Sequence, residues 1–302
     1  MFAGVTTHAM LSILIPTFNF DCTSLVQRLA VQARTLDTPT EIVVADDGST
    51  DPAAVRALDR LPADFGVRLV RPPHNLGRAA IRNFLGREAR GEWLLFLDSD
   101  GLPPNPDFLA RYAPQLTDKT DVVCGGIVHP DRCPSPAVAL RYRYEKAAEA
   151  RFTVARRNEQ PYGAFRSFNF AIRRPLFLAV GFDESFRRYG YEDVLFGQQL
   201  ARRGARVVHI NNPLLNTDLE ANTDFLRKTE EALHTLADHC DQLGPHVRLH
   251  ARLAKLRRAG LTRSLRLAYR TLAPQLRRQL TGSHPSVFLF NVYKLLYLNQ
   301  LL

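Results

Sequence analysis

The chain has few cysteines and no long apolar run, and each shortage excludes a class of protein. Its 302 residues include only four cysteines, which are scattered and form no C-x-x-C pair. A zinc ribbon or a disulfide-built scaffold is therefore not expected. No run of about 18 apolar residues occurs, so no membrane-spanning helix is predicted. Residues 1–11 lack the basic start and apolar stretch of a secretory signal. Together these features favour a cytoplasmic protein.

Acidic residues are absent from the C-terminal fifth of the chain. Residues 242–302 hold eleven Lys or Arg and no Asp or Glu, whereas residues 1–241 hold 29 basic and 30 acidic residues. The formal net charge of +10 therefore originates in the C-terminal part. We predict two parts with different electrostatic roles, a catalytic domain over residues 1–220 and a helical, basic extension over 221–302.

Short apolar segments alternate with helical patterns through the first 130 residues. Apolar runs predict strands at 11–16, 41–45, 67–70, 92–97 and 121–128, and helical spacing or capping signals occur at 22–35, 52–61, 77–89 and 106–116. This alternation predicts an α/β fold, a mostly parallel sheet with helices on both faces. Further along, the patterns predict strands at 167–174 and 205–210, helices at 137–151 and 192–204, a polar loop near 153–163, and helices beyond 222 that Pro274 kinks or divides.

Asp98-Ser99-Asp100, directly after an apolar strand, carries the strongest chemical signal. Residues i and i+2 of an extended segment point the same way, so the two carboxylates project together. They repel each other unless a cation lies between them, and a divalent ion takes carboxylate and diphosphate oxygens together. An isolated Asp-x-Asp is more often a solvated turn, but other acidic strand ends accompany this one.

Two further polar segments follow or precede predicted elements. Asp47, after the second strand, can accept hydrogen bonds from a base or a ribose, whereas Asp51 is interpreted as the cap of the next helix. Gly77 begins a helix on which Arg78 and Arg82 share one face. Basic groups are expected near a diphosphate, although such surface arginine pairs are common.

Glu192 and Asp193 begin a predicted helix, where an ionised carboxylate is favoured. Ordinary helix-terminal charge explains them equally well, but Gly190 and Tyr191 provide an aromatic lip beside them that suits a sugar. His209 is a lone polar residue in an apolar strand. Such a histidine is usually a satisfied core residue, and it becomes a candidate metal ligand only because the rest of the site calls for a cation.

Taken together, these segments resemble the family 2 glycosyltransferases of the GT-A fold over about residues 11–215. The matching segments are Ile15 to Asn19, Asp46 to Asp51, Asn75 to Asn83, Asp98 to Asp100, Gly181 to Glu184, and Glu192-Asp193. The resemblance implies an inverting enzyme that uses a UDP- or dTDP-sugar with Mn²⁺ or Mg²⁺. The Arg-Asn pair follows Ile81 where alanine is commoner in the family, and no family motif extends beyond residue 220.

The resemblance also implies residue roles. Nucleotide binding would fall to Pro16, Thr17, Asn19, Asp47, Asn75, Arg78, Arg82 and Asp98. Asp100 and His209 would bind the metal, Asp193 would be the catalytic base, and Glu192 would lie beside the acceptor. The implied reaction is a single in-line displacement at the anomeric carbon, with inversion.

Several alternatives stay open on sequence alone. The acceptor is a glycan or a lipid-linked molecule. The apolar segment 287–302 suits an interfacial helix on an anionic, cytoplasmic membrane face, or packing on the catalytic domain or a second subunit. A catalytically silent nucleotide-sugar-binding protein is the main rival. A sugar nucleotidyltransferase is less favoured, because residues 15–21 lack a basic, Gly-rich loop. Nucleic acid is not expected, because no aromatic stacking platform accompanies the basic tail.

Overall fold

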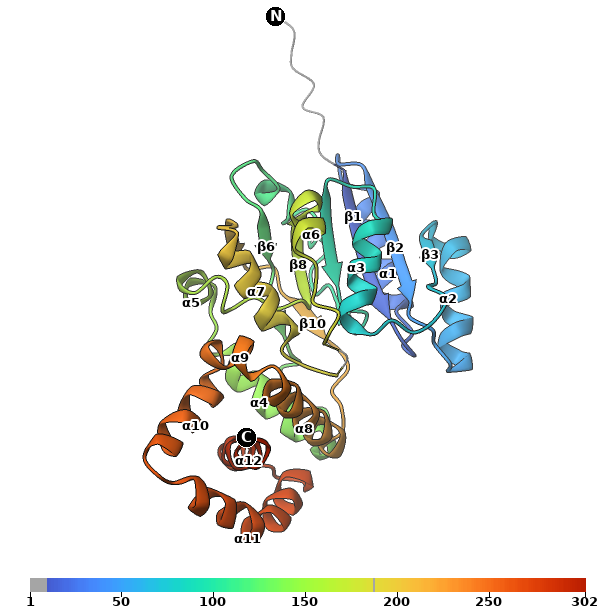
Figure 1. The fold of residues 1–302 in the computed structure, drawn as a ribbon. Helices are drawn as coiled ribbons and strands as arrows, with labels where there is room; N and C mark the ends of the chain where they lie inside the picture. The colour runs from blue at the N-terminus through green and yellow to red at the C-terminus, as the bar shows by residue number, and fades with distance from the viewer. Residues whose placement is uncertain (1–9, 187) are drawn as a thin grey trace, which may run out of the picture.

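A seven-stranded sheet forms the centre of the computed structural model, which describes residues 10–186 and 188–302 (Figure 1). The strand order is β3-β2-β1-β4-β8-β6-β9. β1 pairs in parallel with β2 and β4, whereas β8 runs antiparallel to β4 and β6. The strands are β1 (Leu11–Thr17), β2 (Thr40–Asp46), β3 (Arg68–Val70), β4 (Trp93–Leu97), β6 (Val122–Cys124), β8 (Asn169–Arg173) and β9 (Val207–His209). The predicted α/β fold with a mainly parallel sheet is confirmed.

Helices cover both faces of this sheet. One apolar cluster joins β1 and β2 to α1 (Thr23–Ala33) and α2 (Pro52–Phe65). A second joins the opposite side to α3 (Arg78–Glu88), α6 (Arg174–Val180) and α7 (Glu192–Arg202). Asp51 caps α2 as predicted, because its carboxylate accepts from the backbone N–H groups of Ala53 and Ala54. The carboxyl ends of the parallel strands are left open toward the helices of the C-terminal part.

A second, three-stranded sheet connects distant segments beside the strand ends. β5 (Gly101–Leu102) pairs with β10 (Leu214–Asn216), which also pairs with β7 (Ile127–Val128). The backbone N–H and the Oγ1 of Thr217 donate to the carbonyl of Asp100 at 2.9 and 2.8 Å. Residues that follow β10 therefore lie next to the Asp98–Asp100 segment.

Several predicted elements differ from the structure. The strand predicted over 121–128 is divided into β6 and β7, because Gly126 takes a left-handed φ of 102°. The proline-interrupted segment 106–116 forms turns and one 3₁₀ turn, η1 (Ala113–Gln115), in place of a helix. The polar loop near 153–163 contains α5 (Val154–Glu159), which the Thr153 hydroxyl caps. Pro274 lies inside an unbroken helix, α11 (Thr262–Thr281), and does not divide it.

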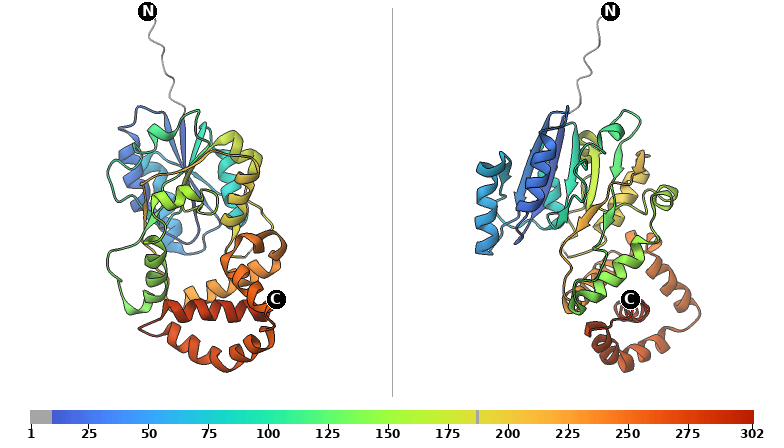
Figure 2. Two further views of the ribbon diagram at one scale, coloured as in Figure 1. Left: turned by 90° about the vertical axis from the view of Figure 1, so that its left-hand side faces the viewer. Right: turned by 180° about the vertical axis from the view of Figure 1, so that it is seen from behind.

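The C-terminal helices form a bundle that also includes α4 (Ala139–Glu149), together with a short 3₁₀ turn, η2 (Pro136–Val138), that precedes α4. Its other helices are α8 (Asn222–Asp238), α9 (Cys240–Leu243), α10 (Arg248–Arg258), α11 (Thr262–Thr281) and α12 (Val287–Leu301), with η3 (Gly244–His246) before α10. Figures 1 and 2 show α12 surrounded by the other helices. Its residues Phe290, Tyr293, Leu296 and Leu298 are buried. Of the two alternatives left open for 287–302, packing within the protein is therefore the one that the structure shows.

The bundle and the sheet part share an apolar cluster. Phe186 and Leu195, beside and on α7, pack with Leu233, Leu236 and Leu298 from the bundle. By packing, α4 belongs to the bundle although it precedes residue 220. Among the helices of the described residues, none combines the length and apolar character that crossing a bilayer requires.

Candidate active site

Asp47 fastens the end of β2 to the loop that leads into α3. Its buried carboxylate accepts from the backbone N–H groups of Leu76 and Gly77 at 2.7 and 2.9 Å. The Asn75 side chain donates to the Asp47 carbonyl at 2.6 Å. Burial raises the pKa of Asp47. Asp47 and Asn75, two of the residues predicted to bind nucleotide, therefore lie together where the end of β2 meets the loop before α3.

Pro16, Thr17 and Asn19 lie at the end of β1, beside the loop that follows β2. Asn19 has a left-handed φ of 50°, and its side-chain oxygen accepts from the backbone N–H groups of Thr50 and Asp51 at 2.6 and 2.8 Å. Thr17 is buried and donates to the carbonyl of Phe20. Asn19 thus connects the loop after β1 to the loop after β2. Nucleotide binding by Pro16, Thr17 and Asn19 stays a prediction.

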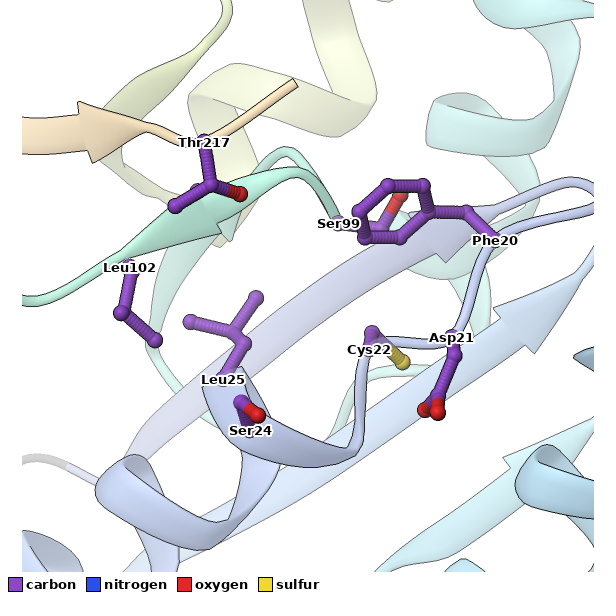
Figure 3. A pocket seen from close by; sticks show the side chains of 9 residues that line it. Phe20, Asp21, Cys22, Ser24, Leu25, Ser99, Leu102 and Thr217 are labelled. Carbon is purple, nitrogen blue, oxygen red and sulfur yellow. The ribbon is translucent and has the colours of Figure 1, made fainter. Parts of the chain in front are cut away.

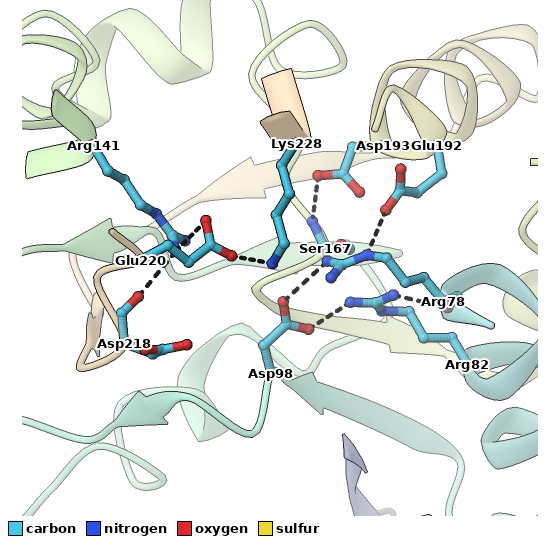
Figure 4. A network of polar contacts seen from close by, with 10 residues as sticks. All are labelled: Arg78, Arg82, Asp98, Arg141, Ser167, Glu192, Asp193, Asp218, Glu220 and Lys228. Atoms are coloured by element: carbon cyan, nitrogen blue, oxygen red, sulfur yellow. Dashed lines mark hydrogen bonds and ion pairs between the residues drawn. The ribbon is translucent and has the colours of Figure 1, made fainter. Parts of the chain in front are cut away.

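Arg78 and Arg82 connect Asp98, after β4, with the start of α7 (Figure 4). The buried Arg82 donates through Nη2 to Asp98 Oδ1 at 2.5 Å and through Nη1 to the Arg78 carbonyl at 2.8 Å. Arg78 Nε donates to Glu192 Oε1 at 3.1 Å, and its Nη2 lies 3.8 Å from Asp98 Oδ2. Three predicted site segments therefore meet at one edge of the sheet, although Arg78 and Glu192 are 114 residues apart in the sequence.

Asp100 is a half-buried carboxylate that lies close to a second one, Asp98. Burial, and then the neighbouring Asp98 carboxylate, raise the pKa of Asp100 to about 6. In residues 10–186 and 188–302, no side chain forms an ion pair with it within 4 Å. The same residues contain no group of three or more His, Cys, Asp or Glu side chains that could enclose a metal. Asp100 with Asp98 still fits a Mg²⁺ or Mn²⁺ site, because such ions are held by one or two carboxylates with substrate phosphates and water.

His209 does not fit the predicted metal role. It is buried at the end of β9, and burial lowers its pKa to about 4. Its Nε2 lies 2.8 Å from the Pro161 carbonyl, which can only accept, so this nitrogen carries the proton. Nδ1 faces Arg157 Nη1 at 3.3 Å and accepts from it. Neither nitrogen is left for a cation, so the assignment of His209 as a metal ligand is wrong in this structure.

The two carboxylate oxygens of Asp193 differ in their hydrogen bonding. Oδ2 accepts from the Ser167 backbone N–H at 3.2 Å, whereas Oδ1 is buried with no hydrogen-bond partner among the described residues. Burial, and then Glu192, raise the pKa of Asp193. Leaving a buried oxygen unpaired costs about 1–3 kcal/mol, and an acceptor hydroxyl donating to Oδ1 would relieve this.

Three charged residues beside the candidate site were not predicted from the sequence. Arg141 on α4, Glu220 after β10 and Lys228 on α8 form a chain of ion pairs beside the residues above (Figure 4). They come from the bundle and from the segment that leads into it, where the sequence contains no recognised motif. The excess of positive charge in residues 242–302 gave no hint of them, because all three residues precede that segment.

A hollow of about 220 Å³ opens behind the Asp98–Asp100 segment (Figure 3). Phe20, Cys22, Ser99, Leu102 and Thr217 are among its lining residues. None of the predicted nucleotide-binding residues lines it. The hollow is therefore a neighbour of the candidate site and is not the site itself.

The sequence profile of Glycosyl transferase family 2 matches residues 12–182, which include Asp47, Arg82 and Asp98 but end before Glu192 and Asp193. The chain belongs to this family. The predicted family is therefore confirmed, and the candidate site lies in and beside the matched segment.

This chain spans half or less of the length of each of the three curated relatives that follow. Validoxylamine A glucosyltransferase of Streptomyces hygroscopicus subsp. limoneus is 31% identical over 67% of the chain, which covers 50% of that protein. Hyaluronan synthase of Pasteurella multocida is 27% identical over 66% of the chain, which covers 23% of that protein. An uncharacterized glycosyltransferase of Bacillus subtilis, YfnE, is 34% identical over 38% of the chain, which covers 29% of its length.

Solved structures agree on the fold. The mannosyltransferase PcManGT of Pyrobaculum calidifontis, in complex with GDP-Man and Mn²⁺, has a TM-score of 0.56 at 19% identity, covering 96% of this chain and 86% of that one. S. aureus TarS 1-349, in complex with UDP-GlcNAc, has a TM-score of 0.54 at 19% identity, covering 89% and 78%. At this level of identity the likeness shows the fold alone.

Proposed function

We propose that this protein is an inverting glycosyltransferase, which moves a hexosyl group from a nucleotide-diphosphate sugar onto an acceptor hydroxyl. The observation that carries the proposal is the position of Arg78, which binds both Asp98 after β4 and Glu192 at the start of α7. This contact supports a site in which the donor, near Asp98, and the acceptor, near Glu192, bind next to each other. A UDP- or dTDP-sugar is the proposed donor, and a hydroxyl of a glycan or a lipid-linked molecule is the proposed acceptor.

Asp193 is the proposed general base. Its unpaired Oδ1 accepts the proton of the acceptor hydroxyl while the hydroxyl oxygen attacks the anomeric carbon from the side opposite the diphosphate. The bond from that carbon to the phosphate oxygen breaks with its electron pair on the oxygen, which inverts the configuration. General base assistance is typically worth about 10² to 10⁴ in rate.

Asp100, with Asp98 beside it, is the proposed site for Mn²⁺ or Mg²⁺. When bound, such a cation would neutralise the charge that develops on the departing diphosphate. The protein's own part is to orient Asp100, and the Thr217 contacts with the Asp100 carbonyl hold its backbone in place.

Thermal-shift screening of UDP-, dTDP- and GDP-sugars with and without Mn²⁺ tests the function first. GDP-sugars belong in the panel because a structural neighbour binds GDP-Man. The donor that stabilises the protein is then incubated with the enzyme, and slow hydrolysis or transfer is followed by mass spectrometry. Metal-dependent turnover supports the proposal. Donor binding without any turnover would favour the silent sugar-nucleotide-binding protein instead.

Peripheral attachment to an anionic, cytoplasmic membrane face is proposed for the outer surface of α10 and α11. Leu261, Leu267 and Leu272 are 41%, 64% and 45% exposed there. The same two helices also carry exposed basic residues. In the described part of the chain, seven of these have no acidic side chain within 4 Å: Arg252, Lys255, Arg258, Arg263, Arg266, Arg270 and Arg278. Each basic residue contributes about 1 kcal/mol at an anionic leaflet.

Flotation with anionic and neutral vesicles tests this attachment. The triple variant R263Q/R266Q/R270Q should lose about a hundredfold in affinity for anionic vesicles, because three charges of about 1 kcal/mol each are removed. The matched control R34Q/R56Q/R60Q removes the same charge from exposed positions on and beside α1 and α2. Equal flotation of both variants would contradict the proposal. Truncation before α10 is unsuitable, because Leu298 of α12 packs against Leu195 of α7 in one cluster.

A further inference from the structure

Two cations that converge on one carboxylate form a cluster beside the site. Arg141 Nη1 lies 3.2 Å from Glu220 Oε2, and Lys228 Nζ binds the other carboxylate oxygen, Oε1. The side chains of Arg141, Glu220 and Lys228 are 14%, 15% and 33% exposed. Arg141 Nε is buried with no hydrogen-bond partner among the described residues. One carboxylate thus serves two cations, and donors remain for a second anion.

The cluster adjoins the residues proposed to carry the reaction (Figure 4). Lys228 Nζ lies 5.6 Å from the centre of the Tyr189 ring, and the Arg78 guanidinium lies 5.1 Å from the same centre. Thr217, three residues before Glu220, donates to the Asp100 carbonyl. Lys228 therefore lies beside Tyr189 and Arg78, and Glu220 follows three residues after the contact of Thr217 with Asp100.

We propose that Arg141 and Lys228 form a phosphate-binding pair for the diphosphate of the donor, and that Glu220 occupies this pair until the donor displaces it. The inference rests on the proposed function. Glu220 would then be a stand-in anion, whose carboxylate oxygens mark the place of phosphate oxygens. When the bond to the anomeric carbon breaks, its electron pair stays on the phosphate oxygen, and the two cations stabilise the nucleoside diphosphate that leaves.

A purely structural clamp between α4, the segment 217–220 and α8 is the alternative. The two roles predict opposite effects of one substitution, Glu220→Gln, on the affinity for a diphosphate. In a clamp, Glu220→Gln weakens the assembly just as loss of either cation does. In a phosphate-binding pair, Glu220→Gln removes the anion that competes with the ligand, so the affinity for a diphosphate rises.

Calorimetric titration of the full chain with UDP, dTDP and GDP in the presence of Mn²⁺ tests the inference. The nucleotide that binds the wild type most tightly is used throughout. We expect Arg141→Gln and Lys228→Met each to weaken its binding about tenfold, the loss of one charge-assisted contact. Glu220→Gln should tighten it about threefold, as the competing anion is removed. The corresponding nucleoside, which lacks phosphate, should bind all variants alike.

Arg143→Gln and Arg227→Gln are the matched controls. Arg143 lies two residues from Arg141 and donates to the Pro285 carbonyl, and Arg227 precedes Lys228 with 64% of its side chain exposed. Both should bind the nucleotide like the wild type. Arg141→Met, which also removes the charge, replaces Arg141→Gln if thermal unfolding shows that the latter is unfolded.

The outcomes separate this inference from the proposed function. If no nucleotide binds the wild type, the proposed function fails and takes the inference with it. If a nucleotide binds the wild type and the Arg141 and Lys228 variants equally, the phosphate-binding pair alone is refuted. A weaker affinity in Glu220→Gln would establish the clamp and overturn the inference as well.

Discussion

The sheet part and the helical bundle contribute to the site in different ways. In the sheet part, short local segments after β2 and β4 bear the polar groups, and each group is found where its own strand ends. The bundle bears no such segment, yet it holds the loop that leads into α7. Tyr189 N–H donates to Glu231 at 3.1 Å, and Thr235 Oγ1 donates to the Tyr189 carbonyl at 3.0 Å. Local sequence therefore determines which chemical groups are present, whereas long-range packing determines how they face each other.

Asp193, at the junction of the two parts, should show the largest effect. In Asp193→Asn we expect turnover to fall by about 10² to 10⁴, because the amide cannot accept the acceptor proton. Donor affinity should be unchanged, since the donor contacts are proposed for the sheet part. Steady-state kinetics and calorimetry on the same preparation check both. Wild-type turnover in this variant would exclude Asp193 as the base.

Leu298 tests whether the bundle and the sheet part are stable only together. It is fully buried in the cluster with Phe186, Leu195 and Leu233. Leu298→Ala should lower the free energy of unfolding by about 2–5 kcal/mol. The control Leu267→Ala, at a residue that is 64% exposed, should change it by less than about 0.5 kcal/mol. Equal denaturant midpoints for the two variants would mean that the bundle is not coupled in this way.

Gly190 tests the contact between the loop and α8. It has a left-handed φ of 101°, and a Cβ there would lie 2.7 Å from the Cβ of Ala232 on α8. Gly190→Ala should therefore displace Tyr191 and α7, and we expect kcat to fall about tenfold, the effect of an ångström-scale misplacement at its lower end.

Gly204→Ala is the matched control for that change. Gly204 has a similar φ of 64°, but a Cβ there meets nothing within 4 Å. Its substitution should lower stability by about 1–3 kcal/mol through backbone strain and leave kcat near the wild-type value. Identical kcat values for the two variants would show that the α8 contact does not position α7.

The pH profile of kcat/KM should show the smallest effect. Burial and the neighbouring Glu192 raise the pKa of Asp193, and a general base must be ionised to accept a proton. The acidic limb of the profile should therefore lie above the ordinary aspartate pKa of about 3.9, with activity lost as the pH falls through it. Full activity down to pH values of about 4 would contradict a buried aspartate as the base.

The strands and the donor-side polar groups could be predicted from sequence because their signals are local. β1, β2 and β4 are apolar runs followed directly by polar residues, and a parallel sheet brings such ends to one edge. The misplaced elements depend on single residues. The turn at Gly126 divides one predicted strand, and the Thr153 cap permits a helix where a polar loop was expected.

The errors and omissions in the site arise from contacts between distant segments. His209 was a plausible metal ligand until Pro161 and Arg157, about 50 residues earlier, engaged both of its ring nitrogens. Arg141, Glu220 and Lys228 meet through the packing of α4 and α8, and no local pattern marks such a meeting. Local patterns after β2 and in α3 predicted the proposed roles of Asp47 and Arg82, whereas that of Asn75 came from the family resemblance alone.

The dependence of nucleotide binding on Asp100 and a divalent cation tests the account most directly. Titration of UDP, dTDP and GDP into the wild type should give binding with Mn²⁺ and a loss of at least about tenfold when the ion is chelated. Asp100→Asn should bind weakly under both conditions, whereas Asp107→Asn, at a surface carboxylate paired with Arg111, should behave as the wild type. Nucleotide binding that is equally tight without Mn²⁺ and in Asp100→Asn would contradict a cation held by the carboxylates after β4.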